Sequence, residues 1–268
     1  MAEKFDIAVI GGGIAGISAA ARLSKHAKVG LFEQEDFIAH HSSSRSAAVF
    51  ISDYGNDDVC ELNLITFDEL QSKYPNILKQ RGLMSLEKDG EIDQFTNHSN
   101  SLGLSKISLN EAKKIQPYKR SMARVEIDSD HEINNLPVLF GSDDSWYAKP
   151  DAGSMIVSPA DVSPCEPHDA WADDGDVDLG IYNFESMVEP KVEKLTSNWA
   201  GLRSFAPDQS LVIGPDQDEP NFFWLAGQGG YGFQTCLAAS QITEDILFNR
   251  NPRTSKFLID KFLPDRFT

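Results

Sequence analysis

A glycine-rich turn near the N-terminus constrains the fold of this chain most strongly. Gly11, Gly13 and Gly16 directly follow the apolar run at residues 5–10, and an alanine-rich segment spans residues 14–26. Glycine at the first two positions lets the backbone turn sharply and approach a diphosphate, and the third lets a helix pack closely on a strand. The pattern predicts a buried strand, a tight turn and a helix.

A second strand with an acidic end completes the unit. Residues 28–32 form another apolar run, and Glu33 follows it at the place where a carboxylate can accept a hydrogen bond from a ribose hydroxyl. Ile14 and Ala15 would open the helix, whose N-terminal amides favour negative charge. We predict a βαβ unit that binds a dinucleotide, with FAD and NAD both open at this point.

Composition sets looser limits. The chain has 268 residues, 41 % of them hydrophobic, and a formal net charge of −17. This length can bury a full core in one large or two intertwined domains. The acidic balance disfavours nucleic acid and anionic membrane surfaces as partners. Without a leader or a bilayer-spanning apolar run, we expect a cytoplasmic protein with no integral membrane segment.

The cysteines and the acidic stretch predict no metal site. Cys60, Cys165 and Cys236 are widely spaced and form no C-x-x-C pair, so neither a disulfide framework nor a zinc site is expected. Residues 173–178 are rich in aspartate but lack the spacing of a calcium loop. They are predicted to form a solvated loop and the start of a helix.

Local signals place several further elements. Asn56 is predicted to cap a helix that Pro75 ends, with its apolar residues in the core, and residues 149–153 to form the turn of a hairpin. Ser108 and Glu111 form a capping box for a short helix ending at Pro117. Residues 118–137 show no convincing element. The apolar residues of the helix predicted between Asn56 and Pro75 are Cys60, Leu64, Phe67, Leu70 and Tyr74.

A second glycine cluster, at residues 227–232, again follows an apolar strand and precedes a helix. Such a loop lets backbone amides converge on an anionic or electron-rich group, while a flexible turn is the simpler alternative. Between the two clusters, Arg203 stands among apolar and small residues. Its guanidinium fork suits a carboxylate ligand, although a structural ion pair would also explain it.

Four segments together resemble the DAO family, the FAD-dependent D-amino acid dehydrogenases and glycine/sarcosine oxidases, and within it the proteins similar to D-arginine dehydrogenase. They are residues 42–48, 147–153, 199–205 and 222–235. The resemblance implies an α/β fold, with a Rossmann-like FAD-binding domain formed by residues 1–75 and 205–268. An intertwined α+β substrate-binding domain would be formed by residues 76–204.

The resemblance also implies roles for individual residues. Tyr54 and Tyr147 would line the substrate pocket, although either could be a core residue, and Arg203 would bind the substrate carboxylate. The implied FAD contacts are Gly11, Gly13, Ile14, Ala15, Gly16, Glu33, Ser44, Arg45, Ser46, Ala47, Gly229, Gly230, Tyr231, Gly232 and Gln234.

The family chemistry implied is oxidation of the CH–NH bond of a D-amino acid or related amine. A hydride passes to the flavin, and the imino acid hydrolyses to an oxo acid. Oxygen or a quinone would then accept the electrons. Val49 and Leu83 replace the histidine and the acidic residue of D-arginine dehydrogenase, and Val138 replaces a methionine. A preference for D-arginine is therefore not expected.

The family pattern also jumps between Val125 and Glu132, where about 100 residues of a full two-half dinucleotide fold are absent. Both domains are therefore expected to be incomplete, with exposed strand edges and apolar faces. Two function classes follow: an active flavin-dependent amino acid oxidoreductase, or a non-catalytic remnant that binds FAD weakly or not at all.

Overall fold

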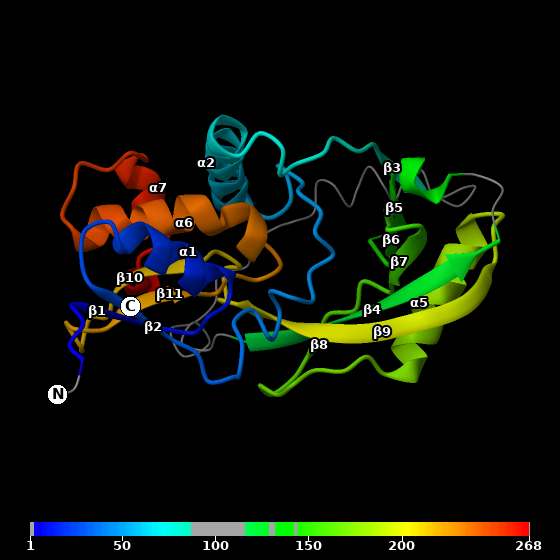
Figure 1. The fold of residues 1–268 in the computed structure, drawn as a ribbon, viewed down its shortest axis with the longest axis horizontal. Helices are drawn as coiled ribbons and strands as arrows, with labels where there is room; N and C mark the ends of the chain where they lie inside the picture. Colours follow the sequence, from blue (N-terminus) through cyan, green and yellow to red (C-terminus); the bar gives the residue numbers. More distant parts are fainter. Residues whose placement is uncertain (1–2, 87–115, 129–131, 142–143, 268) are drawn as a thin grey trace. The chain divides into compact units, whose positions relative to one another are not determined.

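The computed structural model describes residues 3–86, 116–128, 132–141 and 144–267 (Figure 1). The predicted helix at Ser108 and Glu111 lies outside these residues. The chain divides into two compact units. Unit 1 comprises Met1–Leu78, Ile107–Pro117 and Arg203–Thr268, and unit 2 comprises Lys79–Lys106 and Tyr118–Leu202. Each is described by itself, and which of them binds cofactor and which binds substrate stays a prediction.

The predicted βαβ unit opens unit 1. Its two strands pair in parallel, with Ile7 opposite Val29 and Ile10 opposite Phe32. The helix between them starts immediately after the glycine turn, as expected. The elements are β1 (Ile7–Ile10), α1 (Ile14–Leu23) and β2 (Val29–Phe32).

The expectation that the first strand is buried was wrong. Ile10 is 79 % exposed, and Phe32 and the following Ile38 are 46 % and 55 % exposed. Within the described part of the chain, β1 and β2 pair only with each other, so both outer edges and much of the apolar surface lack a covering strand. The expected exposure of edges and apolar faces is therefore present in this pair.

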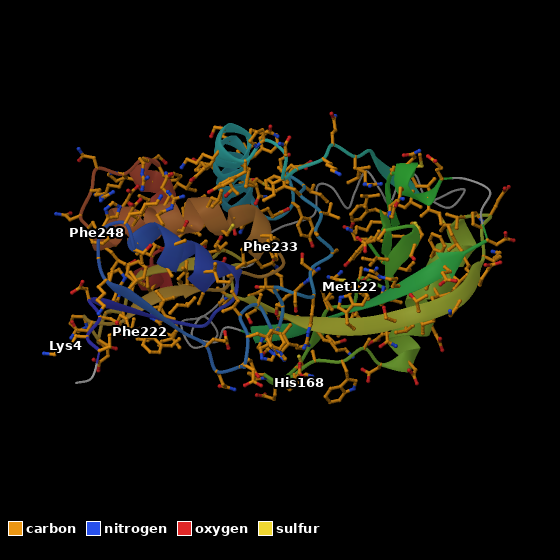
Figure 2. The ribbon with its side chains drawn as sticks, viewed as in Figure 1. Lys4, Met122, His168, Phe222, Phe233 and Phe248 are labelled. Carbon is orange, nitrogen blue, oxygen red and sulfur yellow. The ribbon has the colours of Figure 1, made fainter. Side chains whose placement is uncertain are left out.

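The hydrophobic core of unit 1 is formed by side chains of α2, α6 and α7 together with a hairpin, and α1 packs on α6 beside it. Helices α1 and α2 both pack on α6, and the hairpin of β10 and β11 contributes further apolar side chains (Figure 1). The elements are α2 (Asp57–Lys73), β10 (Val212–Pro215), β11 (Phe223–Ala226), α6 (Gly232–Leu247), α7 (Lys256–Asp260) and η2 (Pro264–Phe267). Some aromatic side chains stay at the surface, including Phe222 beside β11 and Phe233 on the first turn of α6 (Figure 2).

Helix α2 confirms the predicted cap, because the Asn56 side chain accepts a hydrogen bond from the Val59 amide at 3.0 Å. Its predicted core face was wrong. Leu64 and Tyr74 are 54 % and 53 % exposed, whereas Leu62 is fully buried. The buried face of α2, which packs on α6, is narrower and more polar than the spacing of its apolar residues predicted. The buried residues are Val59, Leu62, Asn63 and Thr66.

A buried ion-pair network ties α1, α2 and α6 together. Arg22 of α1 donates to both carboxylate oxygens of Glu69 in α2 at 2.8 Å, and to the Ser240 hydroxyl in α6 at 3.0 Å. Glu244 of α6 pairs with His26 at 2.6 Å and with Arg250 at 3.1 Å. Burial opposes ionisation of Glu244, yet hydrogen bonds from Arg253 and His26 lower the pKa of its carboxyl. The network therefore keeps this carboxylate charged inside the helix layer.

Unit 2 is built on a sheet of seven strands in its described residues, in the order β3-β5-β6-β7-β4-β8, with β9 also paired to β4. Helix α5 packs against β6 and β7. The elements are β3 (Leu83–Leu86), β4 (Gln116–Ile127), η1 (Ile133–Asn135), β5 (Val138–Gly141), β6 (Tyr147–Asp151), β7 (Ser154–Ser158), β8 (Ser163–Pro164), α5 (Asp174–Met187) and β9 (Val192–Phe205).

Two local predictions in unit 2 are confirmed. The predicted hairpin joins β6 to β7, with its turn at Ala152 and Gly153, both at positive φ, whereas residues 149–151 still belong to β6. The acidic stretch starts α5 after Asp173. Pro117 does not end a helix but lies in β4, a twelve-residue strand that the sequence did not indicate. None of the helices in the described residues has the length and apolar character needed to cross a bilayer.

Candidate functional site

The first glycine turn has the backbone geometry that its sequence predicts. Gly11 has φ of +101°, a conformation that favours glycine, and a Cβ there would point into open space. A Cβ on Gly16 would lie 1.9 Å from the Gly11 carbonyl oxygen. The start of α1 therefore sits against the end of β1 at a distance that only glycine permits.

The Glu33 carboxylate folds back onto this turn. It accepts hydrogen bonds from the amides of Gly12 at 2.6 Å, Gln34 at 2.8 Å and Glu35 at 3.1 Å. Hydrogen bonds to the charged form, foremost that from the Glu35 amide, hold the pKa of Glu33 below its usual value. The turn and the acid are thus locked together at the carboxyl end of β2.

This arrangement makes the stability of unit 1 depend on pH through Glu33. Because its pKa is lowered in the folded protein, Glu33 contributes stability that is present above about pH 4.3 and is lost as the pH falls through the folded value. We expect Glu33→Gln to lower the unfolding midpoint near pH 6 and the difference from wild type to shrink toward pH 3. Thermal unfolding at stepped pH would measure this. Glu61→Gln, on the exposed face of α2, controls for the loss of one charge, and a difference independent of pH would contradict the prediction.

The second glycine loop lies against the first. A Cβ on Gly232, the first residue of α6, would stand 3.2 Å from the Ile14 side chain at the start of α1. The two helix N-termini are thus neighbours, although their sequence positions are more than 200 residues apart. Gly227 and Gly229 have φ of +67° and +51°, as the tight loop requires. The Gly229 amide is already engaged, because it donates to the Ser204 carbonyl at 2.8 Å.

Arg203 stands over this loop. A Cβ on Gly230 would meet the Arg203 guanidinium at 3.2 to 3.5 Å, so the side chain lies flat against the glycine. Among the described residues, no hydrogen bond or ion pair joins this guanidinium to another group. The structural ion pair that would have explained Arg203 is therefore absent from this part of the chain, and the cation remains available to an anionic ligand.

Comparison with known proteins identifies the family. The profile of the DAO family, described as FAD dependent oxidoreductase, matches residues 6–113 and 97–246. The chain belongs to this family of FAD-dependent oxidoreductases.

Solved structures of similar fold include several oxidoreductases. Glycine oxidase from Geobacillus kaustophilus has a TM-score of 0.72 at 13 % identity, with 95 % of this chain and 97 % of that chain covered. L-Proline dehydrogenase from P. horikoshii has a TM-score of 0.72 at 16 % identity, with coverages of 100 % and 98 %. L-α-Glycerophosphate oxidase from Mycoplasma pneumoniae, solved with FAD bound, has a TM-score of 0.72 at 12 % identity, with coverages of 98 % and 99 %. These likenesses confirm the mixed α/β fold, in a chain shorter than its full-length neighbours.

FAD is the cofactor of the DAO family, and the first glycine turn fits its adenosine diphosphate half. The Glu33 carboxylate has about four acceptor positions, of which three are taken by amides, so one remains for a ribose hydroxyl. Gly11 leaves open space where a side chain would block a diphosphate. The Ile14 amide donates to the Ser43 hydroxyl at 2.9 Å, while the amides of Ala15 and Gly16 have no partner in the described residues. These two amides can meet the negative charge.

Tyr231 lies in the second glycine loop and is packed between two aromatic side chains. Its ring packs edge-on against Tyr54, at a centroid distance of 5.5 Å, and against Phe205 at 5.7 Å. Burial and the neighbouring Tyr54 raise the pKa of Tyr231 to about 12, although Arg203 opposes the shift. Its phenol therefore stays protonated at neutral pH and can donate a hydrogen bond.

The two predicted pocket tyrosines have different surroundings. Tyr54 is 40 % exposed in unit 1, so it is not a core residue. Tyr147 belongs to unit 2, where it is buried in β6 and stacks on Phe140. Its hydroxyl is buried without a hydrogen-bond partner in the described residues. Tyr54 is therefore too exposed for a core residue, and Tyr147 is a core residue whose hydroxyl lacks a partner among the described residues. The roles of both tyrosines stay predictions.

The predicted flavin loop, residues 44–47, has hydrogen bonds to neighbouring parts of the same segment. Ser44 donates to the carbonyls of His40 and His41, and the Ser46 hydroxyl accepts from the Ala48 amide at 3.0 Å. The link to the second glycine loop comes just afterwards, where the Ile51 amide donates to the Gln234 side chain at 3.0 Å. The contacts predicted for Arg45 and Ala47 with FAD remain predictions.

Sequence reasoning missed Ser43 and Gln228. Ser43 caps the Ile14 amide, and both polar atoms of the Gln228 amide are buried without a hydrogen-bond partner in the described residues. Gln234 likewise has an unpartnered nitrogen. A run of serines does not reveal which one faces the helix, whereas Gln228, as the polar residue inside the glycine cluster, was visible in the sequence.

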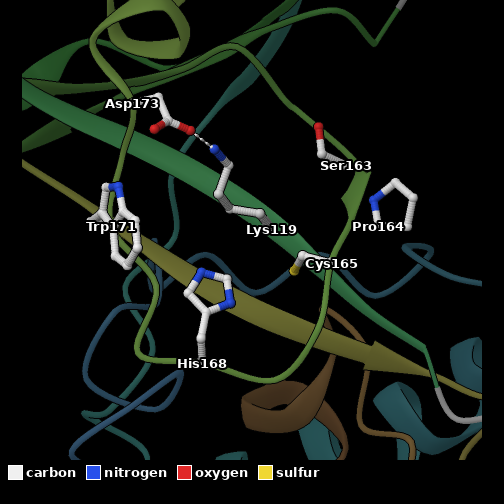
Figure 3. A pocket seen from close by; sticks show the side chains of 7 residues that line it. All are labelled: Lys119, Ser163, Pro164, Cys165, His168, Trp171 and Asp173. Atoms are coloured by element: carbon white, nitrogen blue, oxygen red, sulfur yellow. Dashed lines mark hydrogen bonds and ion pairs between the residues drawn. The ribbon is translucent and has the colours of Figure 1, made fainter.

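A separate pocket of about 290 Å³ lies in unit 2 and contains none of the predicted site residues. Figure 3 shows the rings of Trp171 and His168 on one side of Lys119, with Ser163 and Pro164 on the other. Burial alone would lower the pKa of Lys119, but hydrogen bonds to the carboxylates of Asp173 and Asp176 raise it. Lys119 thus keeps its positive charge, but the two carboxylates balance that charge, so Lys119 is not free to bind an anionic ligand. Its lining residues are Lys119, Ser163, Pro164, Cys165, His168, Trp171 and Asp173.

Proposed function

We propose that this protein oxidises the CH–NH bond of a D-amino acid or related amine. The observation that carries the proposal is the Arg203 guanidinium, which lies against Gly230 and has no anionic partner in the described residues. A bidentate pair with a carboxylate would satisfy the guanidinium and fix the substrate in one orientation. The names of two structural neighbours, glycine oxidase and L-proline dehydrogenase, support an amino acid or amine as substrate but leave its chirality open.

The residues of the chain would divide the work between cofactor and substrate. Gly11, Gly13, Ala15, Gly16 and Glu33 would hold the adenosine diphosphate half of FAD. Bound FAD would accept the hydride from the carbon next to the amine, leaving an imino acid that water hydrolyses to an oxo acid.

The second glycine loop and the tyrosines would serve the flavin and the substrate. Gly229, Gly230, Tyr231, Gly232 and Gln234 would lie beside the flavin ring, together with residues 44–47. Arg203 would bind the substrate carboxylate, and Tyr54 and Tyr147 would line the pocket. A small or apolar D-amino acid, or a secondary amine such as sarcosine, fits this set better than D-arginine. Oxygen or a quinone would reoxidise the flavin, and we propose the cytoplasm as the location.

The second candidate is a non-catalytic remnant, and two observations favour it. The β1–β2 pair lacks covering strands among the described residues, and the family profile matches in two pieces that overlap at residues 97–113. A match in two pieces supports a missing interior segment. The position expected from the sequence, residues 125–132, lies further along the chain and stays a prediction.

The visible spectrum separates the two candidates. The purified protein would be incubated with FAD, freed of unbound FAD by gel filtration and scanned. We expect a flavin band that coelutes with the protein and that D-alanine, D-proline or sarcosine bleaches without oxygen, with the L-enantiomers as comparison. Absence of the band would show that the protein does not retain FAD and would support the non-catalytic remnant. A band that none of these compounds bleaches would contradict the proposed substrate class.

A further inference from the structure

We propose that Glu35, His40 and His41 form a binding site for a divalent transition-metal ion of the zinc class. Each residue offers one ligand atom, and the three atoms lie within 4.8 Å of one another. Two imidazoles and one carboxylate are a ligand set that suits Zn²⁺, with water completing the tetrahedron. The sequence predicted no metal site, because its cysteines and aspartates lack the spacing of known metal sites.

The three side chains are already close to a binding arrangement. His41 Nε2 lies 2.9 Å from a Glu35 oxygen. Ligands about 2.0–2.2 Å from a tetrahedral zinc ion stand roughly 3.4 Å apart, so the cluster has to contract by no more than about 1.4 Å. His41 and Glu35 are partly exposed, with 46 % and 28 % of their side-chain surface accessible, so an ion can enter from solvent.

His40 supplies an independent sign of a missing ligand. Its Nδ1 atom is buried and has no hydrogen-bond partner in the described residues. A buried ring nitrogen without a partner costs free energy that a metal ion or a proton donor would recover. The His40 ring is held between Phe37 and His41, at centroid distances of 4.6 and 4.7 Å.

The backbone around the cluster is fixed before any ion binds. Ala39 has φ of +60°, an uncommon conformation for a residue with a side chain, and its amide donates to the Gly12 carbonyl at 2.9 Å. Ser44 donates to the His40 and His41 carbonyls at 2.9 and 3.0 Å. Strained conformations that the surrounding structure holds in place are found preferentially at functional sites. The loop therefore presents the two histidines from anchored positions, which lowers the entropic cost of binding an ion.

The experiment is a titration of the purified protein, without added FAD, with Zn²⁺ by isothermal calorimetry. We expect one saturable site, and at least about tenfold weaker binding in His40→Gln, His41→Gln and Glu35→Gln. His168→Gln, which removes a histidine of unit 2 outside the cluster, is the matched control and should bind like wild type. Co²⁺ in place of Zn²⁺ should give visible bands typical of a four- or five-coordinate site in wild type and the control but not in the three variants.

The absence of saturable Zn²⁺ binding, or equal affinity in the cluster variants and in wild type, would overturn the proposal. Circular dichroism identifies any variant that fails to fold. If a histidine variant does not fold, the Zn²⁺ affinity of Glu35→Gln tests the proposal, because this change preserves side-chain size at a partly exposed position. The readout is Zn²⁺ binding and neither FAD nor an amine is added, so the outcome does not depend on whether the protein oxidises an amine.

Discussion

Replacing Arg203 by alanine is expected to lower kcat/KM for an amino acid substrate by roughly 30- to 5,000-fold. Truncating one member of a buried, hydrogen-bonded charge pair costs about 2–5 kcal/mol, and the Arg203 guanidinium has no other anionic partner in the described residues. Because its side chain lies against Gly230, the substrate carboxylate would be held beside the second glycine loop. Steady-state kinetics with the amino acid that bleaches the flavin most effectively would measure the effect.

The control for Arg203 is a change in the substrate. The corresponding amine without a carboxylate has no group for the guanidinium, so the wild type and Arg203→Ala should oxidise it with similar efficiency. Arg203→Lys keeps the charge but loses the bidentate fork, and it should recover only part of the activity. An alanine variant that turns over the amino acid as efficiently as wild type would refute the carboxylate contact.

Replacing Gly16 by alanine is expected to destabilise unit 1 and to abolish FAD binding. The added methyl group would lie 1.9 Å from the Gly11 carbonyl oxygen, a backbone atom, so α1 has to move away from the end of β1. Overpacking of this kind costs typically 1–3 kcal/mol, and the displaced helix no longer directs its amides at a diphosphate. Urea unfolding and flavin absorbance after reconstitution would measure the two effects.

Gly175 provides the matched control for Gly16. It also lies in the first turn of a helix, α5, but a Cβ there meets no atom within 4 Å. Gly175→Ala should therefore be neutral, or stabilising by up to about 1 kcal/mol, with unchanged FAD binding. If Gly16→Ala unfolds at the same urea concentration as Gly175→Ala, the close approach of α1 to β1 does not constrain the protein.

Local signals in the sequence predicted the elements whose cause is local. The glycine turn after β1, the Asn56 cap and the hairpin turn at Ala152 and Gly153 all depend on neighbours a few positions away. The buried face of α2 depends on a distant helix. Thr66 faces α6, and its hydroxyl accepts a hydrogen bond from the Ala238 amide at 3.1 Å. A polar residue with such a partner is invisible to a pattern of apolar spacing.

The missed strand β4 has the same explanation. Its sequence carries Lys119 and Arg124, which argue against a sheet interior. In the structure their charges are matched by Asp173, Asp176 and Asp151, which come from later parts of the chain. The strand is thus stabilised by side chains that no window around it contains.

The candidate site divides in a similar way. Residue type and order indicated the glycines, Glu33 and Arg203, because each has a backbone or charge requirement of its own. The lack of a partner for Arg203 and the approach of His40 and His41 to Glu35 are properties of three-dimensional neighbours. The sequence could indicate that Arg203 needs an anion, but not whether the protein itself supplies one.

The discontinuity of unit 1 has a consequence for its synthesis on the ribosome. Helix α6, on which α1 and α2 pack, begins at Gly232, whereas α2 ends at Lys73. At about 5–20 residues per second, the nascent chain waits roughly 8–30 s between the emergence of α2 and that of its packing partner. During this interval the first two helices and the bare β1–β2 pair offer apolar surface to chaperones and to neighbouring nascent chains. Unit 1, although it contains the N-terminus, therefore completes its folding only after its C-terminal segment has been synthesised.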